Sequence, residues 1–440
     1  MKINEASIAL YLREHPILKE SDKSRRRKYI DFLAYYTNMA ESRYSASLLA
    51  LYKKIVVGDE SYEPVPTPVI SGLFKYRQVL YMDVWFINAF LDKEKAFALL
   101  TELQEKSKLA WIHKKKMQQL YERLYIQDSD VEFPKIEPLI DMWRKNALFF
   151  QQPTQKIAFT ANMSAGKSTL VNALVGKKVN KSQIMACTAK LHYIFNKPFE
   201  DGFTAEDDNV LNLDADYDTL MTDDEENTST KITVSSYFRL MKRDAAPLCF
   251  VDTPGVDSSL DPDHKRITDA EISAGVFDKL VYVIDASGRL GTDAEASYMT
   301  QLAETFGQRP VVFVVNKLDE FRAGEDDISE SLQKIKEDIK RLGFTNSMVC
   351  PVSAYTGCLA KRAAFDNGLD EDEQEELNTK SRLFKRENYN LSKYYPGEVI
   401  EQCKMIISSE ADPEWKKYLQ LLCNCGILPL EYILIKRNEG

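Results

Sequence analysis

Apolar residues recur every three or four positions along the first third of the chain. This spacing gathers them on one face of an α-helix, so residues 1–150 are predicted to form a helical bundle. One long amphipathic helix is predicted to continue up to Gly58, ahead of the proline-rich segment 64–68. Its apolar positions are Tyr29, Phe32, Leu33, Tyr36, Met39, Leu48, Leu49, Tyr52 and Ile55. We interpret the aromatic residues of this region as core positions rather than as a cofactor site.

The pattern changes after Lys156 to short apolar runs that alternate with helical segments. Such alternation is typical of a mainly parallel sheet with helices on both faces, which makes the second part of the chain an α/β domain. Predicted strands lie at 156–160, 190–196, 247–251, 279–285, 310–316 and 347–352, and predicted helices near 167–176, 264–276, 292–306 and 326–342. The apolar run 427–435 is interpreted as a buried helix.

The net charge of −9 is unevenly distributed along the chain. Twelve acidic residues without a Lys or Arg lie in 200–226, and seven more lie in 366–376. Removing these nineteen from the net charge of −9 leaves +10 for the rest, which includes basic runs at 25–28 and 114–116. The segment 198–229 is expected to be a disordered or weakly ordered loop. The basic runs are interpreted as solvated helix faces, with contact to phospholipid head groups or nucleic acid as the alternative.

Other compositional features favour a cytoplasmic protein. No stretch approaches the ~20 apolar residues of a membrane-spanning helix, and the N-terminus lacks the pattern of a secretory signal. Seven scattered cysteines fit reduced thiols. Neither the pair Cys423 and Cys425 nor the four isolated histidines has the spacing of a metal site.

A phosphate-binding loop is predicted at 161–169, between an apolar strand and a helix. Backbone amides at the start of a helix point at phosphate oxygens, a lysine adds positive charge near the β and γ phosphates, and a serine hydroxyl can ligate Mg²⁺. The usual first glycine of the loop is Ala161 here. The residues assigned to binding are Ser164, Ala165, Gly166, Lys167, Ser168 and Thr169, with Ser168 as the Mg²⁺ ligand.

Two further segments are predicted to complete the phosphate and metal site. Asp252 ends an apolar strand and is expected to hold Mg²⁺, while the amide of Gly255 approaches the γ-phosphate. Thr188, in a polar segment after the first helix, is expected to complete the Mg²⁺ shell. The chain would then distinguish a triphosphate from a diphosphate.

The base is predicted to be guanine. Asn316, Lys317 and Asp319 close another apolar strand, and a carboxylate at 319 matches the N1–H and 2-amino donors of guanine. Adenine would leave that charge unpaired. Ser353 and Ala354 end the following strand, where the Ala354 amide is expected to bind the guanine carbonyl oxygen. The segments together indicate GTP and GDP binding.

These motifs resemble those of translation-factor-related GTPases and, within that class, the dynamin superfamily, especially bacterial dynamin-like proteins. The resemblance rests on the core of the phosphate loop at 164–169, Thr188 and Ala189 ahead of the strand 191–194, the insertion before Asp252 and the segment 425–431. It implies a P-loop GTPase domain over 155–440, with insertions at about 198–229 and 358–424, following the helical domain 1–150.

The resemblance also implies how hydrolysis is catalysed. Dynamins use a polar residue of the phosphate loop, the switch threonine and a monovalent cation, completed by dimerisation of GTPase domains. Lys167, Ser164 and Thr188 occupy the matching positions, K⁺ or Na⁺ is the implied cation, and self-association is the implied partner contact. Met163 replaces the usual glutamine of the dynamin loop, and Val256 stands where small GTPases have one. We therefore expect slow basal turnover that self-association or a partner raises.

Three functional classes remain open from the sequence. The first is a dynamin-like GTPase whose nucleotide state changes the pose of the helical domain. One form of this hypothesis places the protein at the inner face of a membrane. The second is a GTP-dependent switch that recruits a protein partner with little hydrolysis. A ribosome- or RNA-associated GTPase is the third, and it is disfavoured because no RNA-binding motif is present and the overall charge is acidic.

Overall fold

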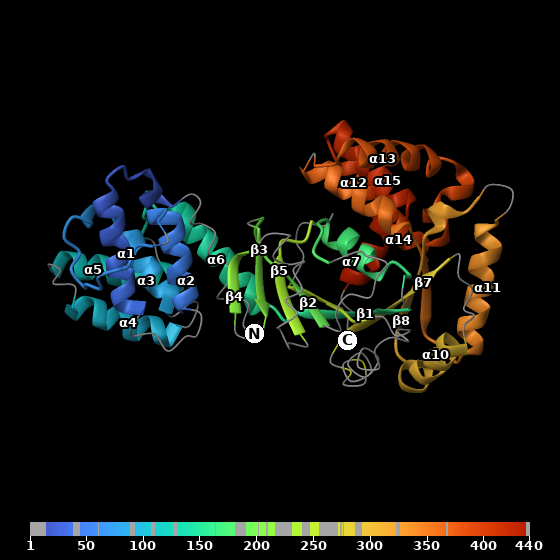
Figure 1. The fold of residues 1–440 in the computed structure, drawn as a ribbon, viewed down its shortest axis with the longest axis horizontal. Helices are drawn as coiled ribbons and strands as arrows, with labels where there is room; N and C mark the ends of the chain where they lie inside the picture. The colour runs from blue at the N-terminus through green and yellow to red at the C-terminus, as the bar shows by residue number, and fades with distance from the viewer. Residues whose placement is uncertain are drawn as a thin grey trace. The chain divides into compact units, whose positions relative to one another are not determined.

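The chain folds into two compact units in a computed structural model. One unit comprises Met1–Pro153 with Pro198–Ala215, and the other Thr154–Lys197 with Asp216–Gly440. The structure describes residues 15–37, 45–59, 61–88, 93–106, 111–125, 131–162, 164–180, 191–200, 202–207, 210–215, 231–239, 247–254, 272, 275, 277–286, 293–322, 326–366 and 368–436. Figure 1 labels the elements of both units.

The first unit is a helical bundle with a strongly aromatic core. The predicted core positions Tyr29, Phe32 and Tyr36 are fully buried, and Trp85 and Trp143 join them. The interpretation of these aromatics as core is thereby confirmed. The helices are α1 (Lys23–Thr37), α2 (Ser45–Tyr52), α3 (Arg77–Asn88), α4 (Lys93–Lys106), α5 (Trp111–Tyr125) and α6 (Glu137–Gln151), with short turns of helix at Pro16–Lys19, Lys53–Val57 and Phe74–Tyr76.

The single long helix predicted for the start of this unit is wrong. The Arg26 guanidinium donates a hydrogen bond to the Val56 carbonyl at 3.4 Å. In one continuous helix these residues would lie about 45 Å apart, since each residue adds 1.5 Å. The chain therefore reverses direction between α1 and α2. Both helices carry the same apolar periodicity, so the spacing alone could not reveal the break.

A buried carboxylate connects helix α3 to three other parts of the bundle. Asp83 of α3 is fully buried and accepts hydrogen bonds from the hydroxyl groups of Tyr29 and Tyr52, the latter at 2.9 Å. The Nε2 atom of His15 lies 3.0 Å from the same carboxylate. Burying a charge without partners is costly, so this set of contacts is what makes an aspartate tolerable in an apolar helix.

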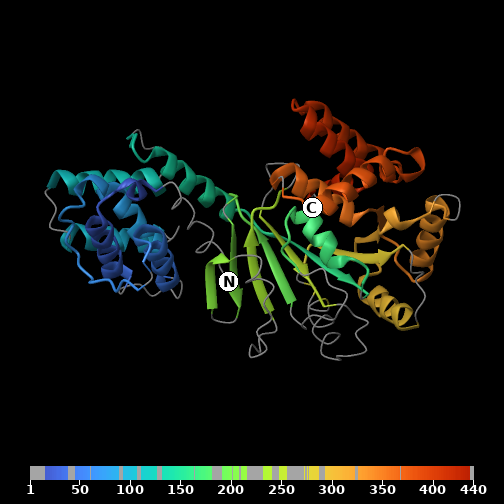
Figure 2. The same cartoon turned by 45° about the horizontal axis from the view of Figure 1, so that its top comes forward.

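The second unit contains a mainly parallel sheet, as Figures 1 and 2 show. Its strands lie in the order β5-β2-β6-β1-β7-β8-β9, and β2 with β6 is the antiparallel pair of this series. All six predicted strands form within one residue of their predicted ends, which confirms the fold class. The strands are β1 (Gln155–Ala161), β2 (Leu191–Asn196), β5 (Lys231–Ser236), β6 (Leu248–Asp252), β7 (Lys279–Asp285), β8 (Val311–Asn316) and β9 (Ser347–Pro351).

Part of the acidic segment was predicted wrongly as a disordered loop. Residues Phe203–Asp207 form β3 and residues Val210–Ala215 form β4, and the two strands pair antiparallel. They are grouped with the first unit. Acidic composition predicts poor burial, but a hairpin is stabilised by backbone hydrogen bonds that composition does not report. Residues 216–230 lie outside the described residues.

Helices cover both faces of the sheet. Helix α7 and the C-terminal helices lie on one side of it in Figures 1 and 2. Connections between parallel strands are right-handed as a rule, and this rule puts α10 and α11 on the other side. The predicted helices near 167–176, 292–306 and 326–342 are present, whereas the one near 264–276 falls largely outside the described residues. The bounds are α7 (Lys167–Val175), α10 (Asp293–Phe306), α11 (Ile328–Arg341), α12 (Ala354–Asp366), α13 (Glu371–Leu383), α14 (Gly397–Ser409), α15 (Pro413–Asn424) and α16 (Ile427–Ile435).

Among the helices that the structure describes, α16 is the most apolar. Ile427, Leu428, Leu430 and Leu434 are all buried, which confirms the interpretation of this run as a buried helix. In the part of the chain that the structure describes, no single helix has the length and apolar character needed to cross a bilayer. Within the same described residues, the pair α15 and α16, bent by 79°, reaches that length and composition when the two helices are taken together.

Candidate functional site

The phosphate-binding loop connects β1 to α7 as predicted. Ala161 is buried as the last residue of β1, in an extended conformation that any residue adopts, so the missing glycine causes no strain. The positive φ angles occur later in the loop, at Ser164 (65°) and Gly166 (83°). This backbone turns the chain sharply into α7, whose first residues are Lys167 and Ser168.

Three side chains contact the carboxylate of Asp252 at the end of β6. The Lys167 ammonium donates to Oδ1, the Ser168 hydroxyl lies 3.3 Å from Oδ2, and the Asn180 amide donates to Oδ2 at 2.5 Å. The strand itself is fixed because Thr253 bonds the Phe159 carbonyl through both its amide (3.2 Å) and its hydroxyl (2.9 Å). The structure therefore brings the predicted residues of the phosphate loop and Asp252 together.

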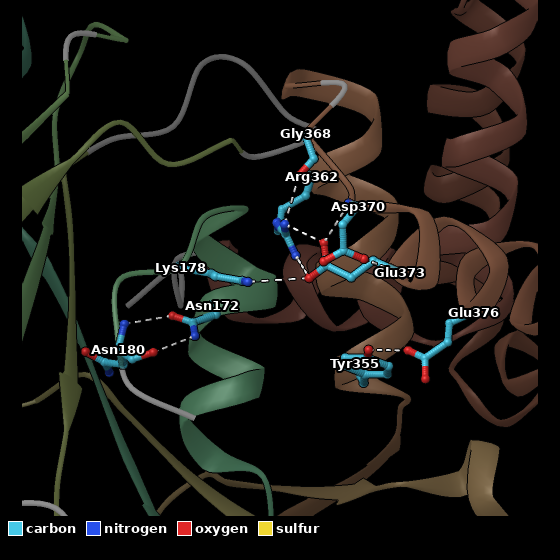
Figure 3. A network of polar contacts seen from close by, with 9 residues as sticks. All are labelled: Asn172, Lys178, Asn180, Tyr355, Arg362, Gly368, Asp370, Glu373 and Glu376. Carbon is cyan, nitrogen blue, oxygen red and sulfur yellow. Dashed lines mark hydrogen bonds and ion pairs between the residues drawn. The ribbon is translucent and has the colours of Figure 1, made fainter. Parts of the chain in front are cut away.

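Asn180 is a site residue that the sequence analysis missed. Asn172 of α7 holds it in place, because the Asn172 Oδ1 atom accepts from the backbone amides of Val179 and Asn180 at 2.9 Å each. The Asn172 amide returns a hydrogen bond to the Asn180 carbonyl at 2.9 Å (Figure 3). His192 of β2 lies 3.0 Å from the Asn180 side chain. No sequence spacing distinguishes this asparagine from an ordinary loop residue.

Asn316 joins the phosphate loop to the loop predicted to contact the base. Its side-chain amide donates to the Ala165 carbonyl at 3.1 Å, and its side-chain oxygen accepts from the Ala354 amide at 2.9 Å. The residue is 3% exposed, so both bonds are shielded from water. The Ala354 amide, predicted to bind the guanine carbonyl, thus already has a partner in the protein.

Replacing Gly166 with alanine is expected to weaken GDP binding by about tenfold or more. A left-handed conformation costs a residue with a Cβ about 1–2 kcal/mol, and about 1.4 kcal/mol corresponds to tenfold in affinity. The added Cβ would also lie 2.4 Å from the Asn316 amide nitrogen and displace it from Ala165. Calorimetric titration with GDP measures the change. Gly397→Ala is the matched control, because its Cβ would meet nothing within 4 Å; equal losses in both variants would contradict this account.

Both charged residues of the predicted base-recognition segment carry partners. Lys317 has a left-handed φ of 66°, and its ammonium lies 2.7 Å from Asp285 at the end of β7. Asp319 is 2.6 Å from the ammonium group of Lys380, which comes from α13. Ser353 is fully buried, and its hydroxyl donates to Thr356 at 2.7 Å. The predicted base-recognition residues therefore gather at the carboxyl ends of β8 and β9.

Five residues that the sequence analysis used for this site lie outside the described residues: Met163, Thr188, Ala189, Gly255 and Val256. Thr169 is described as the third residue of α7. In the described part of the chain, no group of three or more His, Cys, Asp or Glu side chains is arranged so that it could bind a metal ion. The hydroxyl of Ser168 and the carboxylate of Asp252 are oxygen donors 3.3 Å apart, which suits a hard cation such as Mg²⁺ that takes few protein ligands.

Comparisons with known proteins agree on the class of the domain. The family model of the elongation factor Tu GTP binding domain matches residues 152–404. A curated relative, the probable transmembrane GTPase FZO-like, chloroplastic, of Arabidopsis thaliana, is 23% identical over 206 residues. That match covers 47% of this chain and 20% of the relative, so the chain spans about a fifth of the relative's length.

Solved structures with a related fold include an oligomerised bacterial dynamin pair, matched over 89% of this chain and 62% of that chain at 17% identity and a TM-score of 0.38. An Era variant from Aquifex aeolicus bound to GDP and AlF4⁻ matches over 60% of this chain and 70% of that chain, at 18% identity and a TM-score of 0.27. Scores at this level transfer no geometry. The family-model match confirms the predicted class of translation-factor-related GTPases. Because the family match spans more than half of the sequence, the chain belongs to the elongation factor Tu GTP binding domain family.

Proposed function

We propose that this chain binds GTP and hydrolyses it to GDP and phosphate in a dynamin-like manner. The observation that carries the proposal is the position of Asn316. Its side chain bonds the phosphate loop at Ala165 and the base loop at Ala354, at 3.1 Å and 2.9 Å. One buried amide therefore fixes the two ends of a nucleotide site relative to each other, which favours a guanine nucleotide over a bare polyphosphate.

Each part of the nucleotide then has a binding group. The backbone amides of Ser164 to Thr169 and the Lys167 ammonium bind the phosphates, and the amide of Gly255 contacts the γ-phosphate. Ser168 and Asp252, with Thr188, would hold Mg²⁺, which would neutralise negative charge on the phosphates. Lys317 and Asp319 bind the base, the latter by accepting from N1–H and the 2-amino group. Lys167 leaves its ion pair with Asp252 to reach the phosphates.

Slow basal turnover is expected because the two positions that would carry a water-orienting glutamine have apolar residues. Met163 cannot orient an attacking water by a side-chain hydrogen bond, and Val256 cannot do so either. Ser164 and Thr188 are the remaining polar groups we assign to orienting water. We propose that self-association of the domain, with K⁺ or Na⁺, raises the rate. One matched structure is of an oligomerised bacterial dynamin pair, which supports this proposal only at the level of analogy.

We propose further that nucleotide state changes the pose of the helical unit, at the surface of a membrane. The bacterial dynamin pair named above provides a mechanism for the long-range sensing and tethering of membranes. In this chain, the start of α5 exposes Trp111 (75%) and Ile112 (55%). The basic run 114–116 follows on the same helix. Exposed aromatic and basic side chains together suit an anionic phospholipid surface.

The experiment is GTP turnover per molecule across a wide range of protein concentration. It is run in K⁺ and in Na⁺, with and without vesicles containing anionic phospholipid. We expect specific activity to rise with concentration, and to rise at lower concentration when vesicles are present. A constant specific activity would exclude activation by self-association. Tight GTP binding with no turnover under any condition would instead favour the GTP-dependent switch.

A further inference from the structure

Helix α13 places a lysine on the carboxylate that is assigned to read guanine. The Lys380 ammonium lies 2.6 Å from the Oδ2 atom of Asp319 and 3.4 Å from its backbone carbonyl. The Asp319 side chain is 7% exposed and that of Lys380 is 21% exposed. The two residues are 61 positions apart in sequence, so α13 rather than the base-recognition segment determines where this charge lies.

The position of α13 is itself fixed by ion pairs, shown in Figure 3. Glu373 accepts two hydrogen bonds from the Arg362 guanidinium of α12, at 2.5 Å and 2.7 Å, and lies 3.4 Å from Lys178. The bonds from Arg362 are the main cause that lowers the pKa of Glu373 to about 2. The carboxylate therefore remains charged, and the helix remains anchored, throughout the neutral pH range.

A second contact ties the same helix to the other half of the base site. Glu376, one turn before Lys380, accepts a hydrogen bond from the Tyr355 hydroxyl (Figure 3). Tyr355 directly follows Ala354, whose amide bonds Asn316. Helix α13 thus contacts both segments assigned to the base: Asp319 through Lys380, and the start of α12 through Glu376.

A nearly buried carboxylate needs such a partner to offset the loss of water and to keep its orientation. Removing a carboxylate from water without compensating hydrogen bonds is costly, and a charge-assisted bond is about twice as strong as a neutral one. Each carboxylate oxygen has two lone pairs, so Oδ2 can accept from Lys380 and from the base together. Recognition of guanine requires both oxygens to face two adjacent donors, which a freely rotating carboxylate would not maintain.

We propose that Lys380 is a positioning residue for guanine recognition, acting through Asp319. The proposal rests on the assignment of this site to guanine nucleotides. Lys380 holds the carboxylate in the orientation that accepts from N1–H and the 2-amino group at once. It therefore sets how strongly the site prefers guanine over a base without the 2-amino group.

The test compares GDP with IDP, whose hypoxanthine base keeps N1–H but lacks the 2-amino group. We expect Lys380→Met to weaken GDP binding about tenfold and IDP binding much less, because the loss falls on the second hydrogen bond. Lys380→Arg, which keeps the charge and its donors, should restore most of the preference for GDP. Arg382→Met is the matched control. Arg382 is exposed on the same helix, and its substitution removes the same charge.

Every outcome of this comparison is decisive. An unchanged ratio of GDP to IDP affinity in Lys380→Met overturns the proposal, and so does tighter GDP binding, which would show that Lys380 competes with the base. Equal losses for GDP and IDP would indicate a structural role alone. Lys380→Gln keeps a neutral donor and serves if the methionine variant does not fold. Failure of the unmodified protein to bind GDP would refute the proposed function instead.

Discussion

Replacing Lys167 with alanine is expected to lower GTP turnover by about a hundredfold or more. The ammonium group is the charge that the phosphate loop brings to the β- and γ-phosphates, and it acts where negative charge moves during phosphoryl transfer. Removing it takes away stabilisation that other loop groups, which are neutral amides and hydroxyls, cannot replace. Steady-state release of phosphate at saturating GTP measures the effect.

The structure indicates that this variant should still fold. Lys167 is paired with Asp252, but that carboxylate also has Asn180 as a donor at 2.5 Å and Ser168 at 3.3 Å. Two partners therefore remain, and we expect only a small change in the unfolding midpoint. Lys334→Ala is the control, because Lys334 is 69% exposed and forms a surface ion pair with Glu330. Turnover that survives in Lys167→Ala, or falls equally in Lys334→Ala, would mean that the activity arises elsewhere.

The sheet and the order of the site segments could be predicted because parallel strands are buried on both faces. Their sequences are continuous apolar runs, as in Val311–Asn316, where every residue of the strand is buried. Each run ends abruptly at a polar residue such as Asp252 or Asn316, and carboxyl ends of parallel strands share one edge of the sheet. Pattern and chemistry therefore pointed to the same positions.

What could not be predicted depends on contacts between distant positions. Asn180 reaches Asp252 across 72 residues, and Lys380 reaches Asp319 across 61. The spacing of apolar residues along the chain does not predict contacts between such distant polar residues. The strand Lys231–Ser236 was missed because three of its six residues are Ser or Thr. It pairs with β2 through backbone hydrogen bonds and needs no apolar run.

A buried ion pair connects the helix of the phosphate loop to the C-terminal helices. The Lys361 ammonium of α12 lies 2.7 Å from the Glu431 carboxylate of α16, and it also donates to the Leu174 carbonyl of α7 at 2.9 Å. The two charged side chains are 0% and 2% exposed. Three helices therefore meet at one cation that water does not reach.

Lys361→Met is expected to destabilise the protein by about 3–5 kcal/mol, because it leaves the Glu431 carboxylate buried without its cation. Urea unfolding followed by circular dichroism measures the change. Lys404→Met makes the same substitution at an exposed position of α14, and it should stay within about 0.5 kcal/mol of the unmodified protein. Similar losses in the two variants would show that the effect is not due to burial.

The double variant Lys361→Met with Glu431→Leu separates the two contributions to this loss. Two apolar side chains need no charge partner. The double variant therefore avoids the cost of burying the Glu431 carboxylate without the Lys361 ammonium. What remains is the lost hydrogen bond to the Leu174 carbonyl, which is expected to cost about 1 kcal/mol. The double variant should therefore be more stable than Lys361→Met alone, although it carries one more substitution. If it is less stable instead, the buried Glu431 carboxylate is not the cause of the loss in Lys361→Met.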